Sequence, residues 1–352
     1  MTNAEPSPVC AHTQSERAGT GPGLCPSCQR IEQFKAGARG QAGSMIVTVF
    51  GDGVLPRGGR IWLGSLIQLL APLGLAERLV RTAVFRLAQD DWLEAVAHGR
   101  RSDYQLTPSG RRRFVEASRH IYAAQSAPWD QRWRLITVTG ELESDHRERL
   151  RRALFWHGFG QLGADCFVHP SADLPAVFDS LESESLTPVL SRLLPLVAAN
   201  PRLPASGNDA DLVRRAWNLQ GLDEAYRAFV SHYAPLLEQW QQTATGLAQE
   251  TAFLIRSLLI HDYRRLLLRD PELPGVLLPP RWAGHEARQL CRALYGLLLP
   301  ASERHLDQHL SLADGQIPTA SALLSERFDL SDSLLADTRA QIKTVASPMD
   351  TS

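Results

Sequence analysis

Apolar residues recur with a helical period in two short neighbouring segments. In residues 61–70 they follow the i, i+3, i+4, i+7 spacing of one helix face, and residues 77–89 carry a second such stripe. Pro72 and Gly74 end the first helix, because a residue before proline avoids helical backbone and glycine suits the turn after a helix. Two short helices joined by a glycine-containing turn predict a helix-turn-helix.

Two strand-like stretches, residues 92–96 and 103–106, follow the second helix and flank a glycine-containing turn. A hairpin in this position predicts a wing. Thr107 and Pro108 then provide the N-cap and first position of a further helix that ends near residue 124. The apolar run at residues 45–50 fits a helix or a strand equally well.

The remainder divides into a mixed segment and a helical one. Strand, helix, strand and strand patterns between residues 132 and 169 are typical of a small ferredoxin-like domain, and helical periodicity dominates from about residue 211. We therefore predict an α+β protein with three domains. They are an N-terminal winged helix-turn-helix (44–127), a middle ferredoxin-like domain (128–210) and a helical C-terminal domain for effector binding or dimerisation (211–310).

The two ends of the chain lack such patterns. Residues 1–43 are rich in Gly, Pro, Ser and Ala and predict a disordered leader, and residues 311–352 predict a flexible tail. Cys25 and Cys28 form a CxxC pair, but tetrahedral zinc needs two further ligands. The spacing of Cys10 and His12 does not specify them as those ligands, so we predict reduced cysteines and no metal.

Composition narrows the class of protein. The chain has 44% apolar and 21% charged residues, which is typical of a globular protein. No stretch approaches the roughly 20 apolar residues of a membrane span, and the N-terminus lacks a basic segment followed by an apolar core. We expect a cytoplasmic protein with no membrane partner.

Charge is distributed unevenly. Residues 57–113 contain ten arginines, no lysine and five acidic residues, although the net charge of the chain is −1. Such a local excess suits a phosphate backbone. The alternative is a solvated helix face with ordinary surface ion pairs, but the order helix, turn, helix and basic wing favours DNA.

The expected DNA contacts fall into two groups. On the second helix, Arg78, Arg81 and Thr82 are candidates for base edges in the major groove, because an arginine fork matches guanine O6 and N7. Contacts with phosphates are expected from Arg86, and contacts with phosphates or the minor groove from Arg100 and Arg101. Tyr104 is a further candidate for DNA binding.

A polar cluster interrupts an otherwise apolar helix near residue 261. His261, Tyr263, Arg264 and Arg265 are candidates for effector binding: the cationic side chains suit the phosphates of an acyl-CoA, and nearby Tyr and Leu residues suit its acyl group. The alternative is a buried structural network that ties Asp262 to an arginine.

Several short motifs follow one another between about residues 44 and 305. They are Ile46–Asp52, Ile61–Ile67, Glu77–Leu87, Gly99–Ser102, Trp129–Asp130, Trp156–Gly160 and His261–Arg265. In this order and at this spacing they resemble the motifs of the PaaX family, the transcriptional repressors of phenylacetic acid degradation.

The resemblance implies a homodimer that binds double-stranded operator DNA and is released by phenylacetyl-CoA, an aryl-CoA effector, with no cofactor. It also implies that residues 45–50 are helical and that the middle domain is similar to the CRISPR-adaptation nucleases.

Enzymatic functions have weaker support. The chain lacks a phosphate-binding glycine loop and a Gly-x-Ser-x-Gly elbow, and the first strand of the middle domain ends in Val138-Thr139-Gly140 without the aspartate that a metal-dependent nuclease needs. We predict no catalytic residue. The alternatives are a metal-dependent nuclease on the middle domain, an acyl-CoA hydrolase on the C-terminal domain, or two assembly domains with DNA release controlled by a protein partner.

Overall fold

The computed structural model describes residues 25–122, 129–201, 203, 206–242, 248–321, 324 and 327–329. Their chain forms two compact units. The first combines the described parts of Met1–Ala124, Ala228–Arg264 and Glu286–Ser352, and the second combines those of Gln125–Arg227 and Arg265–His285. The winged helix and most of the C-terminal helices, which the sequence suggests as separate domains, thus belong to one unit.

The first unit begins with a long helix, α1 (Pro26–Val49), which continues into the π-turn η2 (Phe50–Val54) and the 3-10 turn η3 (Leu55–Arg57). The expectation of a disordered leader through residue 43 is therefore wrong for residues 26–43, and residues 1–24 lie outside the described residues. Ile31, Phe34, Ala38 and Ala42 are buried about one turn apart. Burial of this stripe stabilises a segment whose glycines lower its intrinsic helix propensity.

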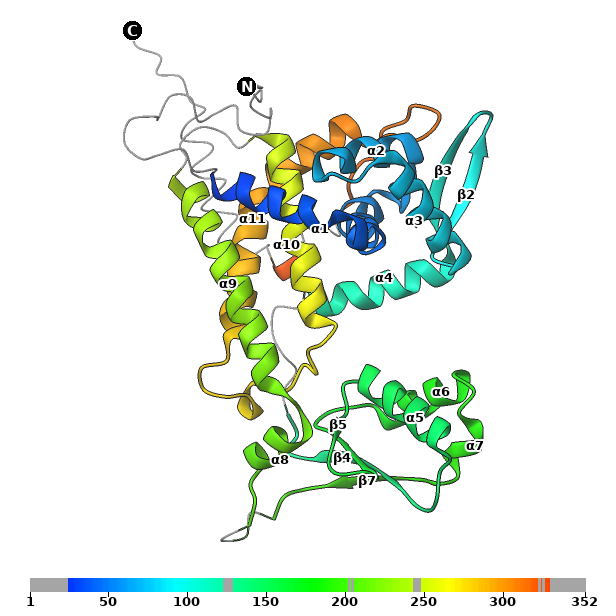
Figure 1. Ribbon diagram of the computed structural model, residues 1–352, viewed down its shortest axis with the longest axis vertical. Helices are drawn as coiled ribbons and strands as arrows, with labels where there is room; N and C mark the ends of the chain where they lie inside the picture. The colour runs from blue at the N-terminus through cyan, green and yellow to red at the C-terminus, as the bar shows by residue number, and fades with distance from the viewer. Residues whose placement is uncertain are drawn as a thin grey trace. The chain divides into compact units, whose positions relative to one another are not determined.

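The winged helix-turn-helix is confirmed (Figure 1). Its elements are β1 (Arg60–Trp62), α2 (Leu63–Leu70), η4 (Ala71–Leu73), α3 (Glu77–Gln89), β2 (Leu93–His98), β3 (Arg101–Leu106) and α4 (Pro108–Ile121). Gly74, with φ 75°, makes the turn that ends η4. The strands form an antiparallel sheet in the order β1-β3-β2. Thr107 caps α4 as predicted, because its Oγ1 accepts a hydrogen bond from the Gly110 amide at 2.8 Å.

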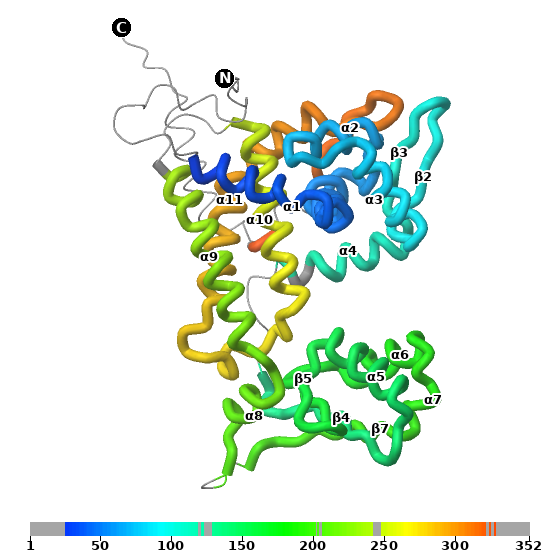
Figure 2. Tube along the Cα trace, in the orientation of Figure 1, coloured from blue at the N-terminus to red at the C-terminus, as the bar shows by residue number. Residues whose placement is uncertain are grey.

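Three long helices follow later in the chain: α9 (Leu219–Gln242), α10 (Gln249–Leu267) and α11 (Ala283–His309). Figure 2 shows the trace of α1, in blue, passing beside that of α10, in yellow. Arg30 of α1 pairs with Asp262 of α10, and the Trp240 indole of α9 donates to Ser27 Oγ of α1 at 2.9 Å. α1 also packs against α3. The helix therefore has the DNA-binding elements on one side and the C-terminal helices on the other.

The segment after α11 is ordered where it is described. The Trp62 amide donates to the Ser311 carbonyl at 3.0 Å, and Ala313 and Leu324 are buried. A short turn, η7 (Arg327–Asp329), contributes two more buried residues, Arg327 and Phe328. The prediction of a flexible tail from residue 311 is wrong for these positions, and residues 330–352 lie outside the described part.

The second unit has the ferredoxin-like fold. It contains β4 (Trp133–Val138), α5 (Ser144–Trp156), β5 (Gly160–Gln161), β6 (Cys166–His169), α6 (Leu174–Ser183), α7 (Thr187–Leu190), β7 (Leu193–Ala198), α8 (Asp209–Ala216) and η5 (Gly275–Leu277). The antiparallel sheet has the order β5-β6-β4-β7. One face packs through Ile136 and Phe167 against α5 and α6. The other packs through Trp133 and Val168 against Val213 of α8.

Candidate nucleic-acid interface

Helix α3 has one buried and one exposed face. Val80, Ala83 and Val84 are buried, which fixes the rotation of the helix about its axis. The opposite face is exposed and carries Arg78, Arg81, Thr82, Phe85 and Arg86. Phe85 is 60% exposed, an uncommon position for a phenylalanine and one suited to contact with a thymine methyl group.

The polar groups of this face are held only by local contacts. Arg81 pairs with Glu77 at 2.7 Å, but both side chains are more than half exposed. A helical pair of this kind contributes only about 0.2–0.5 kcal/mol, so the arginine is readily exchanged to another acceptor. The Thr82 hydroxyl donates to the Arg78 carbonyl at 2.9 Å, which leaves its oxygen free to accept from a base amino group.

The wing places its two arginines differently. Arg100 is exposed in the turn that Gly99 makes with φ 59°. The Arg101 guanidinium lies 4.9 Å from the Trp62 ring and donates to the Ala313 carbonyl at 3.3 Å. Arg101 therefore contacts the body of the unit, although it is exposed. Tyr104 is half-buried on β3.

A buried carboxylate at the base of the wing was not predicted. Asp103 has no exposed surface and accepts hydrogen bonds from Arg60 Nε at 2.8 Å and from the Ala313 amide at 2.7 Å. It thereby joins β1, β3 and the segment after α11. An aspartate in an alternating strand gave no sequence signal for this role, because one partner lies 210 residues away.

Three of the four proposed effector residues belong to the first unit, and two of these are buried. His261 is fully buried; its Nε2 is 3.1 Å from Gln41 Oε1 and its Nδ1 3.3 Å from Thr48 Oγ1. Tyr263 is also buried. Arg264 is half-buried and donates to Ser44 Oγ at 2.7 Å, whereas Arg265 is exposed.

The neighbouring Asp262 pairs with Arg30 of α1 and accepts from the Tyr233 hydroxyl at 2.7 Å. The structural network that the sequence left as an alternative is therefore present, with its arginine on a helix that was not predicted. In this structure only Arg264 and Arg265 of the four candidates have surface to offer a ligand.

A second buried network surrounds Asp52 of η2. Its Oδ2 is 2.7 Å from Arg256 Nε, and its Oδ1 is 2.8 Å from Arg327 Nη1 and accepts from the Tyr122 and Tyr295 hydroxyls at 2.6 and 3.0 Å. Burial acts to raise the pKa of Asp52, but the two guanidinium groups outweigh burial and hold that pKa below its ordinary value. The carboxylate is charged in the folded protein.

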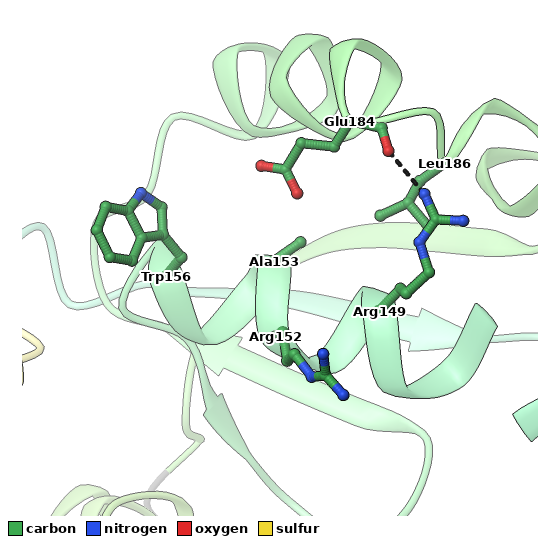
Figure 3. A pocket seen from close by; sticks show the side chains of 6 residues that line it. All are labelled: Arg149, Arg152, Ala153, Trp156, Glu184 and Leu186. Atoms are coloured by element: carbon green, nitrogen blue, oxygen red, sulfur yellow. Dashed lines mark hydrogen bonds between the residues drawn. The ribbon is translucent and has the colours of Figure 1, made fainter. Parts of the chain in front are cut away.

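The second unit has a shallow hollow on α5 (Figure 3). Its volume is about 370 Å³, and it is lined by Arg149, Arg152, Ala153, Trp156, Glu184 and Leu186. The Trp156 side chain is 75% exposed, and Arg149 is directed to the Glu184 carbonyl, to which it donates at 2.9 Å. An exposed indole beside guanidinium groups suits a flat or anionic surface, but the hollow is too open to enclose a ligand.

The described residues show no other centre of this kind. Among them, no three His, Cys, Asp or Glu side chains are grouped as metal ligands would be. Within the same residues, no helix is both long enough and apolar enough to cross a membrane.

Comparison with known proteins agrees with this architecture. Three segments match family descriptions: residues 41–110 a PaaX-like protein, residues 126–193 the PaaX protein central Cas2-like domain, and residues 217–308 the PaaX-like protein C-terminal domain. The chain is 37% identical over 288 residues to the transcriptional repressor PaaX of Escherichia coli (strain K12), which covers 81% of this chain and 89% of that one.

Among solved structures, Uncharacterized protein Rv0674 from Mycobacterium tuberculosis shares 25% identity over 68% of this chain and 88% of that one. The TM-score of 0.45 is too low for this similarity to support an argument. The family matches and the identity to the E. coli protein are sufficient by themselves: the chain belongs to the PaaX family.

Proposed function

We propose that this protein is a cytoplasmic, DNA-binding transcriptional repressor of phenylacetate catabolism genes that acts as a homodimer and is released from its operator by phenylacetyl-CoA. The observation that carries the DNA-binding part is the exposed face of α3, with three arginines and a threonine beside a wing that exposes Arg100. The 37% identical E. coli protein is named a transcriptional repressor. The effector is the one that the family resemblance implies.

The spacing on α3 supports a division of labour. Residues 78, 81, 82 and 85 follow the i, i+3, i+4, i+7 pattern and thus share one helix face that the major groove admits. Arg78 and Arg81 would read guanines, with Thr82 beside them. Arg86, one turn further, and Arg100 would contact phosphates, which position the protein without reading sequence. For Arg101 and Tyr104 we propose contacts with the DNA backbone, in addition to their packing within the unit.

A gel shift with the DNA upstream of a neighbouring phenylacetate operon tests both parts of this function. The expected result is a discrete complex at moderate salt that phenylacetyl-CoA dissociates and free CoA does not. No complex would contradict DNA binding. A complex that is indifferent to phenylacetyl-CoA would contradict the effector alone.

The dimer is proposed to form through β7. Because β7 is an edge strand, one side of its backbone has no neighbour within the sheet, and it exposes Leu194, Leu196 and Val197 by 46%, 43% and 54%. An apolar edge of this kind favours pairing with another strand. A second copy is the partner that a palindromic operator requires, because two-fold symmetry in the protein matches two half-sites about one helical turn, or a multiple of it, apart.

Leu196→Lys is therefore expected to weaken dimerisation by about tenfold or more, because a charge would be placed on the pairing edge. The dissociation constant would be measured by analytical ultracentrifugation. Val276→Lys is the matched control, since Val276 is 79% exposed in the same unit but lies on η5. Equal dimerisation of both variants would place the interface elsewhere.

For the effector phosphates, we propose Arg264 and Arg265 as contacts, with His261 and Tyr263 supporting them from the interior. Arg265→Ala is expected to raise the phenylacetyl-CoA concentration needed for half-release by about fivefold, because an exposed ion pair contributes up to about 1 kcal/mol. The control is Arg281→Ala, which removes another exposed arginine of the same unit. A midpoint unchanged in the Arg265 variant would remove this residue from the site.

A further inference from the structure

Two residues beyond α11 are inserted into a buried socket in the first unit. We define the socket by Asp52 of η2, Tyr122 at the end of α4 and Tyr295 of α11. The Arg327 guanidinium donates to Asp52 Oδ1 at 2.8 Å, to the Tyr295 hydroxyl oxygen at 2.9 Å and to the Gly51 and Asp52 carbonyls at 2.9 and 2.7 Å. Its Cζ lies 4.3 Å from the Tyr122 ring centroid.

Phe328 fills the apolar part of the socket. It has no exposed surface, and its ring centroid lies 5.2 Å from that of Tyr122 and 5.3 Å from that of Tyr295. Its amide donates to the Tyr122 carbonyl at 3.1 Å. The two residues are thus bound through an aromatic ring, a cation and backbone hydrogen bonds, which are the elements by which a protein binds a small aromatic ligand.

The backbone shows that this insertion is strained. Phe328 has φ 56° and ψ 22°, the left-handed region, which a bulky aromatic residue rarely adopts. A residue persists in that region only where surrounding contacts hold it there. The contacts in the socket stabilise Phe328 against its own backbone preference, so another aromatic group that occupied the socket would release this strain.

The socket also lies where an occupant can influence DNA binding. Asp52 follows α1 directly and Tyr122 ends α4, and both elements belong to the winged-helix part, whereas Tyr295 and Arg256 belong to α11 and α10. The occupant therefore touches both the DNA-binding elements and the C-terminal helices. If it left, Asp52 would keep Arg256 as a partner, so the buried carboxylate would not remain uncompensated.

We propose that this socket binds the aryl ring of the effector, and that the ring displaces the Phe328 side chain, which occupies the socket in the absence of effector. The inference rests on the proposed release by an aryl-CoA and names its site. Arg264 lies eight residues beyond Arg256 on α10, about 12 Å along the helix axis. That separation is shorter than an extended pantetheine arm, so the ring can occupy the socket while the phosphates contact Arg264.

Removal of the Phe328 ring tests the proposal. Because Phe328 competes with the ligand, the observed affinity equals the affinity of the empty socket multiplied by the fraction of time that Phe328 leaves the socket empty. Phe328→Ala is therefore expected to bind phenylacetyl-CoA about tenfold or more tighter in isothermal titration calorimetry, and to release operator DNA at a correspondingly lower effector concentration. Phe328→Leu, which keeps an apolar side chain in place, is expected to fold where the alanine variant does not and to shift both values in the same direction.

The control is Phe253→Ala, which removes a buried ring of the same unit that stacks on His305 outside the socket. It is expected to bind phenylacetyl-CoA as the parent does. Equal or weaker binding by both Phe328 variants, with the parent still released from DNA by the effector, would overturn the socket and leave the proposed function intact. A different outcome is that the Phe328 variants bind phenylacetyl-CoA more tightly while the effector does not dissociate the parent protein from operator DNA. It would support the socket as the binding site and contradict the proposed release mechanism.

Discussion

Asp52→Ala is expected to lower the free energy of unfolding by about 3–5 kcal/mol, the range for removing one partner of a buried ion pair. The substitution would leave Arg327, 7% exposed, without the carboxylate it pairs with, and Arg256, 1% exposed, with Glu303 as its remaining carboxylate partner. Two buried tyrosine hydroxyls would lose their acceptor as well. Urea unfolding followed by circular dichroism would measure the loss.

Asp307→Ala is the matched control. Asp307 also binds a buried arginine, Arg57, at 2.7 Å, but its own side chain is 56% exposed and Arg57 keeps a second partner in Glu303. The expected loss is at most about 1 kcal/mol. Similar urea midpoints for the two variants would show that the Asp52 network contributes no more than a surface pair.

The second large effect concerns the operator. Arg81→Ala is expected to weaken operator binding by roughly 5- to 150-fold, because a bidentate contact with guanine contributes about 1–3 kcal/mol. Binding to a scrambled duplex would change much less, since phosphate contacts dominate there. Fluorescence anisotropy with both duplexes would separate these outcomes.

Arg100→Ala is expected to affect DNA binding differently from Arg81→Ala. It is expected to weaken binding to both duplexes and to lower the slope of log affinity against log salt by about 1. Arg214→Ala, which removes an arginine 74% exposed on α8, is expected to leave both affinities unchanged. If Arg81→Ala binds the operator as tightly as the parent, α3 does not read the sequence through this residue.

The winged helix was predictable because its signals are local. The stripe of Val80, Ala83 and Val84 repeats within one helix, and Thr107 and Pro108 mark a helix start on their own. The candidate DNA-binding residues on α3 follow from the same period, since they lie on the helix face opposite the buried stripe. Pattern reading also identified the ferredoxin-like fold from its first strands.

Features that depend on distant residues were not predictable. Between Gly37 and Gly43, the buried apolar positions of α1 are Ala38 and Ala42, too weak a stripe to predict a helix without the distant helices that pack against it. Asp52 meets Arg256 and Arg327 across 204 and 275 residues of sequence. The polar cluster at His261 was visible, but its two interpretations differ only in a partner on α1, which the sequence does not reveal.

The position of α1 has a consequence for how this protein is made. Its partner helices α9 and α10 are synthesised some two hundred residues later, so during translation the DNA-binding elements leave the ribosome before the surface that covers α1 exists. Domains that emerge first normally fold first. Here apolar residues of α1 stay uncovered until α9 and α10 have been synthesised. A chain that ends before α10 would therefore expose this surface of α1 and depend on chaperones, so it would not compete for the operator.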